Sequence, residues 1–98
     1  MTIKKINGED LLKLDPSYKI IDVRTAEEYK NGHIKNSINI PLDKILENDF
    51  DLAKDEKLVI HCRTNGRSGM AIEKLAELGY KNLKMAPGVE LYDYDLIK

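Results

Sequence analysis

The chain has 98 residues, of which 42% are hydrophobic and 34% are charged, and its formal net charge is -1. This composition is ordinary for a globular domain, and the small net charge gives no reason to expect nucleic acid or a membrane surface as a partner. Because Cys62 is the only cysteine, an internal disulfide is excluded. No stretch resembles a leader peptide or a membrane span. We therefore expect one domain, residues 1–98, in a reducing cytoplasmic setting.

The first half of the chain alternates strand-like and helical segments. Short runs rich in β-branched residues predict strands, and apolar residues at intervals of three and four predict helices. The elements expected here are, in order, an edge strand over 2–6, a short helix capped by Asn7, a strand over 18–23, a helix from Thr25 to Gly32, a strand over 37–40, and a helix containing Leu42, Ile45 and Leu46. Residues 48–56 are acidic and polar, which predicts a surface loop.

The polar residues between these elements are interpreted as having structural roles and not catalytic ones. Asp22 ends an apolar run, and a buried carboxylate needs a partner such as Arg24 or backbone N–H groups. Thr25 and Glu28 have the spacing of a capping box, in which each side chain accepts a hydrogen bond from a backbone N–H that the helix leaves unpaired. His33 follows in a turn, where a lone histidine more often orients the backbone than performs chemistry.

The second half contains the apolar run from Leu58 to Ile60, which is short enough to form a buried strand that ends at Cys62. An irregular loop with Asn65-Gly66, a dipeptide that tolerates positive φ, follows it. From Ser68 apolar residues recur at helical spacing until Gly79, a common end to a helix. The remaining elements expected are a strand over 82–85, a turn over 86–88 and a final short helix in which Val89, Tyr92 and Leu96 share one face.

Cys62 is thus expected where a strand passes through a tight loop into a helix. The first N–H groups of a helix have no partner within it and carry partial positive charge, so such a loop can bind an anion. Arg63 and Arg67 add positive charge, and no Asp or Glu occurs between Lys57 and Glu73 to balance it. A positive setting favours the nucleophilic thiolate form of cysteine. The alternative interpretation is a buried structural cysteine.

The sequence Cys-Arg-Thr-Asn-Gly-Arg-Ser, residues 62–68, resembles the active-site loop of rhodanese-like sulfurtransferases. Two further stretches resemble the family's N-terminal and C-terminal signatures, namely Asp22-Val23-Arg24 with Gly32-His33-Ile34, and Pro87-Gly88-Val89. The chain differs at Asn65-Gly66, because the family often has glycine one place earlier. The resemblance implies an α/β fold, a single rhodanese-like domain with a parallel sheet of about five strands, helices on both faces, and the cysteine loop after the central strand.

This resemblance implies a reaction and a set of site residues. The Cys62 thiolate is expected to take the outer sulfur of a donor such as thiosulfate, to hold it as a persulfide, and to pass it to a thiophilic acceptor. That acceptor is cyanide in vitro, and a thiol or a protein partner in the cell. Cys62 and Arg67 are the expected catalytic residues, and no cofactor or metal is expected. Donor binding is assigned to Arg63, Thr64, Asn65, Gly66, Arg67 and Ser68. Spacing does not decide whether Arg63 faces the site or a partner.

Two other functions are compatible with this loop. His61-Cys62 followed by a loop and Arg67-Ser68 also resembles the signature of cysteine-dependent phosphatases and arsenate reductases. Those enzymes place one more residue between cysteine and arginine than the four found here, so this loop should crowd a phosphate and suit a terminal sulfur. The third possibility is a binding module that keeps the fold without turnover. His61 is not assigned a role, because neighbours on a strand point to opposite faces.

Overall fold

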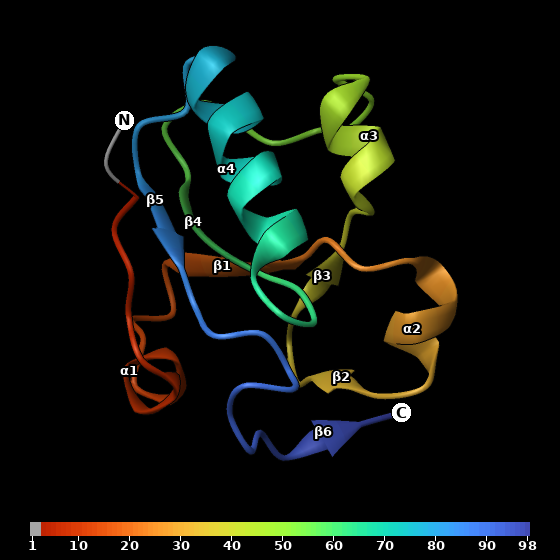
Figure 1. Cartoon of the computed structure of the whole chain (residues 1–98). Helices are drawn as coiled ribbons and strands as arrows, with labels where there is room; N and C mark the ends of the chain where they lie inside the picture. The colour runs from red at the N-terminus through yellow and green to blue at the C-terminus, as the bar shows by residue number, and fades with distance from the viewer. Residues whose placement is uncertain (1–2) are drawn as a thin grey trace.

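The computed structural model describes residues 3–98, which form a parallel sheet with helices on both faces (Figure 1). The strand order in this sheet is β3-β1-β4-β5. Its strands are β1 (Tyr18–Asp22), β3 (Ile38–Asn39), β4 (Lys57–His61) and β5 (Leu83–Met85). A small antiparallel sheet pairs β2 (His33–Ile34) with β6 (Leu96–Ile97). The helices are α1 (Gly8–Leu12), α2 (Ala26–Lys30), α3 (Leu42–Leu46) and α4 (Gly66–Glu77).

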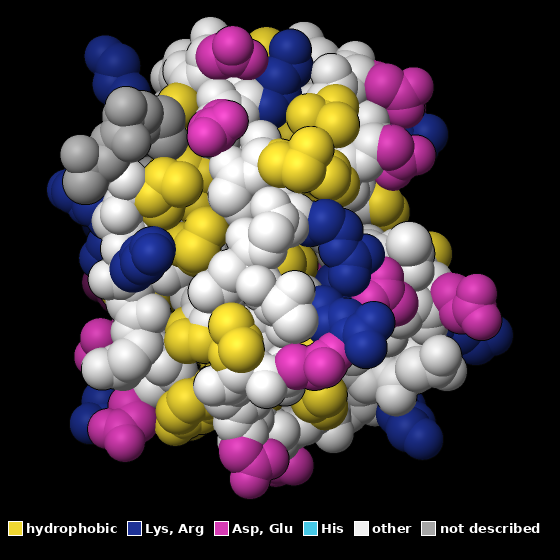
Figure 2. All heavy atoms as spheres, viewed as in Figure 1, with side chains coloured by type: hydrophobic (Ala, Val, Ile, Leu, Met, Phe, Trp, Pro, Cys, Tyr) yellow, Lys and Arg dark blue, Asp and Glu magenta, His cyan; other side chains and the backbone are white. Residues whose placement is uncertain are grey.

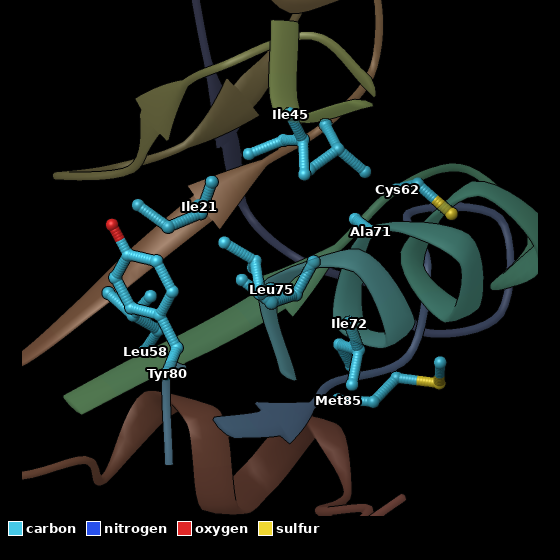
Figure 3. Close-up of a cluster of buried hydrophobic side chains, with 11 residues drawn as sticks. Ile21, Ile45, Leu58, Cys62, Ala71, Ile72, Leu75, Tyr80 and Met85 are labelled. Carbon is cyan, nitrogen blue, oxygen red and sulfur yellow. The ribbon is translucent and has the colours of Figure 1, made fainter. Parts of the chain in front are cut away.

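The central sheet is buried on both faces because successive side chains of a strand point in opposite directions. Ile21 of β1 and Ile60 of β4 pack beneath α3 and α4, in the cluster that Figure 3 shows. Val59 of β4 points the other way and packs with Leu11 of α1 and Tyr94 of the C-terminal segment. The apolar run that contains Val59 and Ile60 is therefore the pattern expected of a central parallel strand.

The longest helix, α4, covers the sheet with the apolar face that the sequence predicts. Ala71, Ile72 and Leu75 are buried against the strands, while Glu73 and Glu77 are exposed. This packing places the first turn of α4 next to Cys62, which belongs to the same buried cluster (Figure 3).

The short helices α1 and α2 both begin with capping boxes; the sequence predicted the box at Thr25 and Glu28 and, for α1, a cap at Asn7. Asn7 accepts a hydrogen bond from the Asp10 backbone N–H at 2.7 Å, and Thr25 accepts one from the Glu28 backbone N–H at 3.2 Å. In both helices the acidic side chain bonds back to the N–H of the capping residue. Helices of five residues are not stable in isolation, so these caps and the tertiary contacts maintain them.

The predicted N-terminal edge strand is present only in part. Its first residue, Thr2, lies outside the described residues. Lys5 forms a parallel bridge with Met85, and Ile6 donates its backbone N–H to the Met85 carbonyl at 2.9 Å. This segment therefore extends the sheet beyond β5 by one edge position, without the length of a regular strand.

The prediction of a C-terminal helix was wrong. Residues 89–92 form a turn and the chain then extends into β6, which pairs with β2, a strand that the sequence analysis did not predict. The backbone N–H groups of Val89 and Glu90 donate to the carbonyls of Cys62 and Arg63, in the loop that follows β4. Of the three residues expected to share one helical face, Val89 and Tyr92 pack against the core, whereas Leu96 is 38% exposed.

Among residues 3–98, no helix is long and apolar enough to cross a membrane.

We predict that Leu75→Ala lowers the free energy of unfolding by about 3 kcal/mol, because it leaves a cavity between α4 and the sheet. Urea denaturation measures the change. Leu12→Ala is the matched control, since Leu12 is 63% exposed and should cost less than about 0.5 kcal/mol. Equal losses in the two variants would contradict the assignment of the core.

Candidate active site

Cys62 lies directly after β4, at the carboxyl edge of the sheet, and only 1% of it is exposed. Its Sγ atom accepts backbone N–H groups from Asn65 at 3.1 Å and from Ser68 at 3.4 Å. The loop therefore curls around the sulfur as it enters α4. Ser68 is also buried, and within the described residues its Oγ atom has no hydrogen-bond partner. The sulfur thus sits among donors that can stabilise negative charge.

Asn65 gives the loop its sharp turn. Its φ of 75° is left-handed, a conformation that asparagine tolerates better than most residues other than glycine. Because Asn65 makes this turn, α4 begins at Gly66, two residues before the predicted start at Ser68. The Asn65 side chain also accepts the backbone N–H of Gly88 at 2.8 Å. Asparagine at this position therefore combines the turn with a contact to the C-terminal segment.

Residues 88–90 hold the first part of the loop from outside. The backbone N–H of Val89 donates to the Cys62 carbonyl at 2.9 Å, and that of Glu90 donates to the Arg63 carbonyl at 3.1 Å. A Cβ on Gly88 would lie 2.1 Å from the Arg63 carbonyl oxygen, so only glycine fits between the two segments. This contact explains why residue 88 is glycine.

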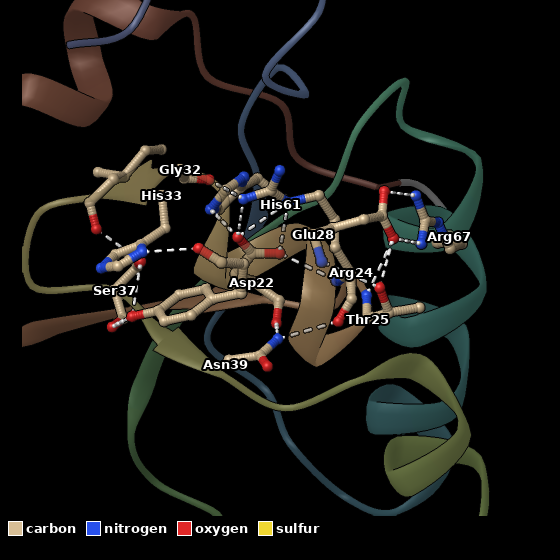
Figure 4. Close-up of polar contacts among 12 residues, drawn as sticks. Asp22, Arg24, Thr25, Glu28, Gly32, His33, Ser37, Asn39, His61 and Arg67 are labelled. Atoms are coloured by element: carbon tan, nitrogen blue, oxygen red, sulfur yellow. Dashed lines mark hydrogen bonds and ion pairs between the residues drawn. The ribbon is translucent and has the colours of Figure 1, made fainter. Parts of the chain in front are cut away.

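Arg67 is bound to a carboxylate from another part of the chain. Its Nη1 and Nη2 atoms donate to the two oxygens of Glu28 at 2.6 and 2.9 Å (Figure 4). The hydrogen bond from Arg67 lowers the pKa of Glu28 to about 2, and the same bond raises the pKa of Arg67. Glu28 therefore both caps α2 and forms an ion pair with Arg67. The expectation that no acid balances the loop was wrong, because the balancing acid comes from α2.

Arg63 is likewise paired, with Glu90, but near the surface. The exposed fractions of the two side chains are 60% and 47%. Figure 2 shows Lys and Arg side chains against Asp and Glu side chains in the middle of the displayed face. The Arg63 side chain thus lies at the rim of the site, while its backbone belongs to the loop.

A buried polar cluster lies on the opposite face of β4 from Cys62 (Figure 4). Asp22 accepts Nε and Nη2 of Arg24 at 3.0 and 2.8 Å and the Arg24 backbone N–H at 2.9 Å, which confirms the predicted partner. Arg24 also donates to the Gly32 carbonyl at 2.7 Å. Asn39 donates to the carbonyls of Asp22 and Arg24. These bonds fix the chain between β1 and α2, and so place α2 beside the cysteine loop.

Neither histidine contacts the sulfur. His61 is fully buried 3.8 Å from Asp22, and burial lowers its pKa, so the ring is neutral at pH 7. It faces away from Cys62, as the alternation of a strand predicts. His33 bonds to the Tyr29 carbonyl at 2.8 Å and stacks on the Tyr29 ring at 3.8 Å, which agrees with a structural role.

The structure brings together only some of the predicted site residues. Asn65 and Ser68 donate hydrogen bonds to the sulfur of Cys62. The other loop residues lie on the outer side: Arg63, Thr64 and Gly66 are exposed, and Arg67 is half-buried. Glu90 was not predicted to be a partner of the loop, and Glu28 was predicted only to cap its own helix. No local pattern could have revealed these contacts, since 39 residues separate Glu28 from Arg67.

A groove of about 650 Å³ lies on the other side of the molecule, between α1 and the sheet, and none of residues 62–68 lines it. Within the described range, no group of three or more His, Cys, Asp or Glu side chains could hold a metal ion. The described contacts at Cys62 are those of a thiol surrounded by backbone donors.

Comparison with known proteins identifies the family. The family model described as the rhodanese-like domain matches residues 7–88. The chain belongs to the rhodanese-like family. The α/β fold with a parallel sheet, expected from the sequence, is confirmed.

The relatives of this rhodanese-like chain include thiosulfate sulfurtransferases. It is 35% identical over 72 residues to thiosulfate sulfurtransferase PspE of Escherichia coli, an alignment covering 71% of this chain and 69% of PspE. It is 29% identical over 103 residues to thiosulfate:glutathione sulfurtransferase of Saccharomyces cerevisiae, covering 88% and 74%. The crystal structure of a rhodanese-related protein from Thermoplasma volcanium matches with a TM-score of 0.84 and 33% identity, covering 96% of this chain and 97% of that one.

We predict that Asn65→Ala lowers the free energy of unfolding by about 2 kcal/mol, because alanine is strained at positive φ and leaves the Gly88 N–H unpaired. Asn65→Gly is the matched control: it also loses the side-chain bond but adopts positive φ without strain. Urea denaturation compares the two variants. Equal losses would show that the backbone conformation of residue 65 contributes nothing.

We predict that the ion pair between Glu28 and Arg67 makes stability depend on pH. Since the pKa of Glu28 falls from 4.5 to about 2 on folding, the pair stabilises the protein above pH 4.5, and this contribution is lost as pH falls toward 2. The loss should be about 1 kcal/mol after allowance for solvent screening.

Urea denaturation between pH 5 and pH 2 tests this dependence. Glu28→Gln keeps a capping side chain but removes the charge, so its stability should fall less over this range than that of the unaltered protein. Glu27→Gln is the control, because Glu27 is exposed in the same helical turn. If the two variants have the same pH dependence, the pair does not produce it.

Proposed function

We propose that this chain is a sulfurtransferase that carries sulfane sulfur as a persulfide on Cys62. The observation that carries this proposal is the environment of Sγ, which is held at the carboxyl end of β4 and accepts two backbone N–H groups. Thiolate and persulfide are both anions of sulfur, so the same donors stabilise both. The relationship to thiosulfate sulfurtransferases supports this function.

The first step is the attack of the Cys62 thiolate on the outer sulfur of a donor such as thiosulfate. A bond forms between the two sulfur atoms, the bond between the outer sulfur and the sulfonate sulfur breaks, and sulfite leaves with the electron pair. The thiolate's electron pair forms the new bond, the outer sulfur keeps its negative charge as the terminal sulfur of the persulfide, and the additional negative charge leaves with sulfite. No proton moves in this step when the thiol is already ionised, so it requires no general base. This fits a site in which neither histidine faces the sulfur.

The loop residues would stabilise the new persulfide and the donor. The backbone N–H groups of Asn65 and Ser68 act on the sulfur in the manner of an oxyanion hole. The Ser68 hydroxyl is buried and unpaired in the described part of the chain, so it can donate a further hydrogen bond. We assign the catalytic roles to Cys62 and Arg67. Binding of the donor is assigned to the loop, Arg63, Thr64, Asn65, Gly66, Arg67 and Ser68.

In the second step a thiophilic acceptor attacks the terminal sulfur and restores the Cys62 thiolate. Cyanide serves as this acceptor in vitro, and a thiol or a protein partner would serve in the cell. Because Cys62 is shielded while Arg63 and Thr64 are exposed, an acceptor must approach over the loop. A single thiol that alternates between thiolate and persulfide is suited to a reducing, cytoplasmic compartment.

We predict that Cys62→Ser and Cys62→Ala each abolish transfer of sulfur from thiosulfate to cyanide, because neither side chain can form a persulfide. Thiocyanate production measures turnover, and intact mass after incubation with thiosulfate alone detects the added sulfur. Thermal unfolding checks that both variants remain folded. Turnover that persists in either folded variant would contradict the mechanism.

The same preparation separates the proposed function from its alternatives. Addition of one sulfur to Cys62 without turnover would indicate a sulfur carrier that awaits a specific acceptor. Hydrolysis of an aryl phosphate with no added sulfur would indicate a cysteine-dependent phosphatase. The absence of both reactions would indicate a rhodanese-like binding module.

A further inference from the structure

The two arginines of the cysteine loop are held by carboxylates in different ways. Arg67 makes two bonds to Glu28, with side-chain exposures of 32% and 30%. Glu28 also accepts the backbone N–H of Thr25 at 3.0 Å, so its position is fixed by the start of α2. Release of Arg67 would therefore break two charged hydrogen bonds to a carboxylate that the helix cap holds in position. Arg67 is the arginine that stays in place.

The contact between Arg63 and Glu90 joins Nε to a carboxylate oxygen, and both side chains face solvent, with exposed fractions of 60% and 47%. Exposed ion pairs contribute little net stability, because water and salt compete for both charges. The backbone of Glu90 is nevertheless fixed, since its N–H donates to the Arg63 carbonyl at 3.1 Å. The Glu90 carboxylate thus stays close to Arg63 even when the ion pair opens. Arg63 is the arginine that can exchange partners.

An anionic donor that approaches Cys62 meets this arrangement at the rim. Its oxygens and the Glu90 carboxylate are alternative partners for the same guanidinium, and they repel each other. The cost increases with the charge of the donor, so a dianion such as thiosulfate is affected more than a monoanion. Removal of the Glu90 charge would leave Arg63 free to bind the donor.

We propose that Glu90 determines donor specificity, by competing with the donor's oxygens for Arg63 and so disfavouring donors of high negative charge. The proposal rests on the proposed function for the identity of the donor. The competition between an anion and the Glu90 carboxylate for Arg63 depends only on charge at the rim of the site. It can therefore be measured without any sulfur transfer.

Alkylation of Cys62 by two reagents of similar size provides that measurement. Iodoacetate is an anion and iodoacetamide is neutral, so the ratio of their rates reports charge at the site and cancels changes in the reactivity of the thiol. We expect Glu90→Gln to raise the ratio of the iodoacetate rate to the iodoacetamide rate roughly threefold to tenfold at low salt. Glu77→Gln, which removes an exposed charge at the far end of α4, should leave the ratio unchanged.

A double-variant comparison distinguishes competition for Arg63 from simple repulsion. If Glu90 acts by occupying Arg63, the effect of Glu90→Gln should be largely lost in protein that also carries Arg63→Gln. Equal effects with and without Arg63 would overturn the proposal, as would an unchanged ratio in Glu90→Gln alone.

Kinetics then extend the test to donors. Thiosulfate is a dianion and methanethiosulfonate is a monoanion, and each transfers its outer sulfur to a thiolate, releasing sulfite and methanesulfinate. Glu90→Gln should lower KM for thiosulfate several-fold and lower it less for methanethiosulfonate. An equal reduction for both donors would contradict the proposed specificity. Failure of the unaltered protein to form a persulfide would overturn the sulfurtransferase function instead, and the alkylation ratio would still decide the role of Glu90.

Discussion

The site depends on the close contact between residues 88–90 and the loop that carries Cys62. Gly88 lies against the Arg63 backbone where no larger residue fits, and the N–H groups of Val89 and Glu90 bond to the Cys62 and Arg63 carbonyls. These bonds pair the Cys62 and Arg63 carbonyls, which point away from the sulfur. The N–H groups of Asn65 and Ser68, later in the loop, point toward the sulfur and donate to it.

The two faces of the sheet make different contributions to this arrangement. The apolar face beneath α3 and α4 excludes water from one side of Cys62 and fixes the start of α4. The opposite face carries the Asp22–Arg24 pair, which holds the chain between β1 and α2. Because α2 carries Glu28, this polar cluster also determines which acid reaches Arg67. The loop is therefore supported by packing from one side and by ion pairs from the other.

The charge around the thiol cannot be obtained by counting residues in the loop. The sequence between Lys57 and Glu73 has basic residues and no acid, yet both arginines are paired in the folded chain. What remains positive at the sulfur comes from backbone N–H groups, which are oriented by the turn at Asn65 and have no competing carboxylate. Backbone dipoles held in this way are a more constant feature of the site than the side-chain charges at its rim.

The sequence by itself determined the features that depend on neighbouring residues: the buried strand before Cys62, the apolar face of α4, the caps at Asn7 and Thr25, and the loop that resembles rhodanese-like proteins. Only the tertiary structure decided the rest. Glu28, Gly88 and Glu90 reach the loop from distant segments, and the segment expected to form a C-terminal helix instead makes a turn and pairs with β2 as β6. Helical periodicity records which residues can share a face, whereas contacts across the fold decide whether their backbone groups bond within the segment or outside it.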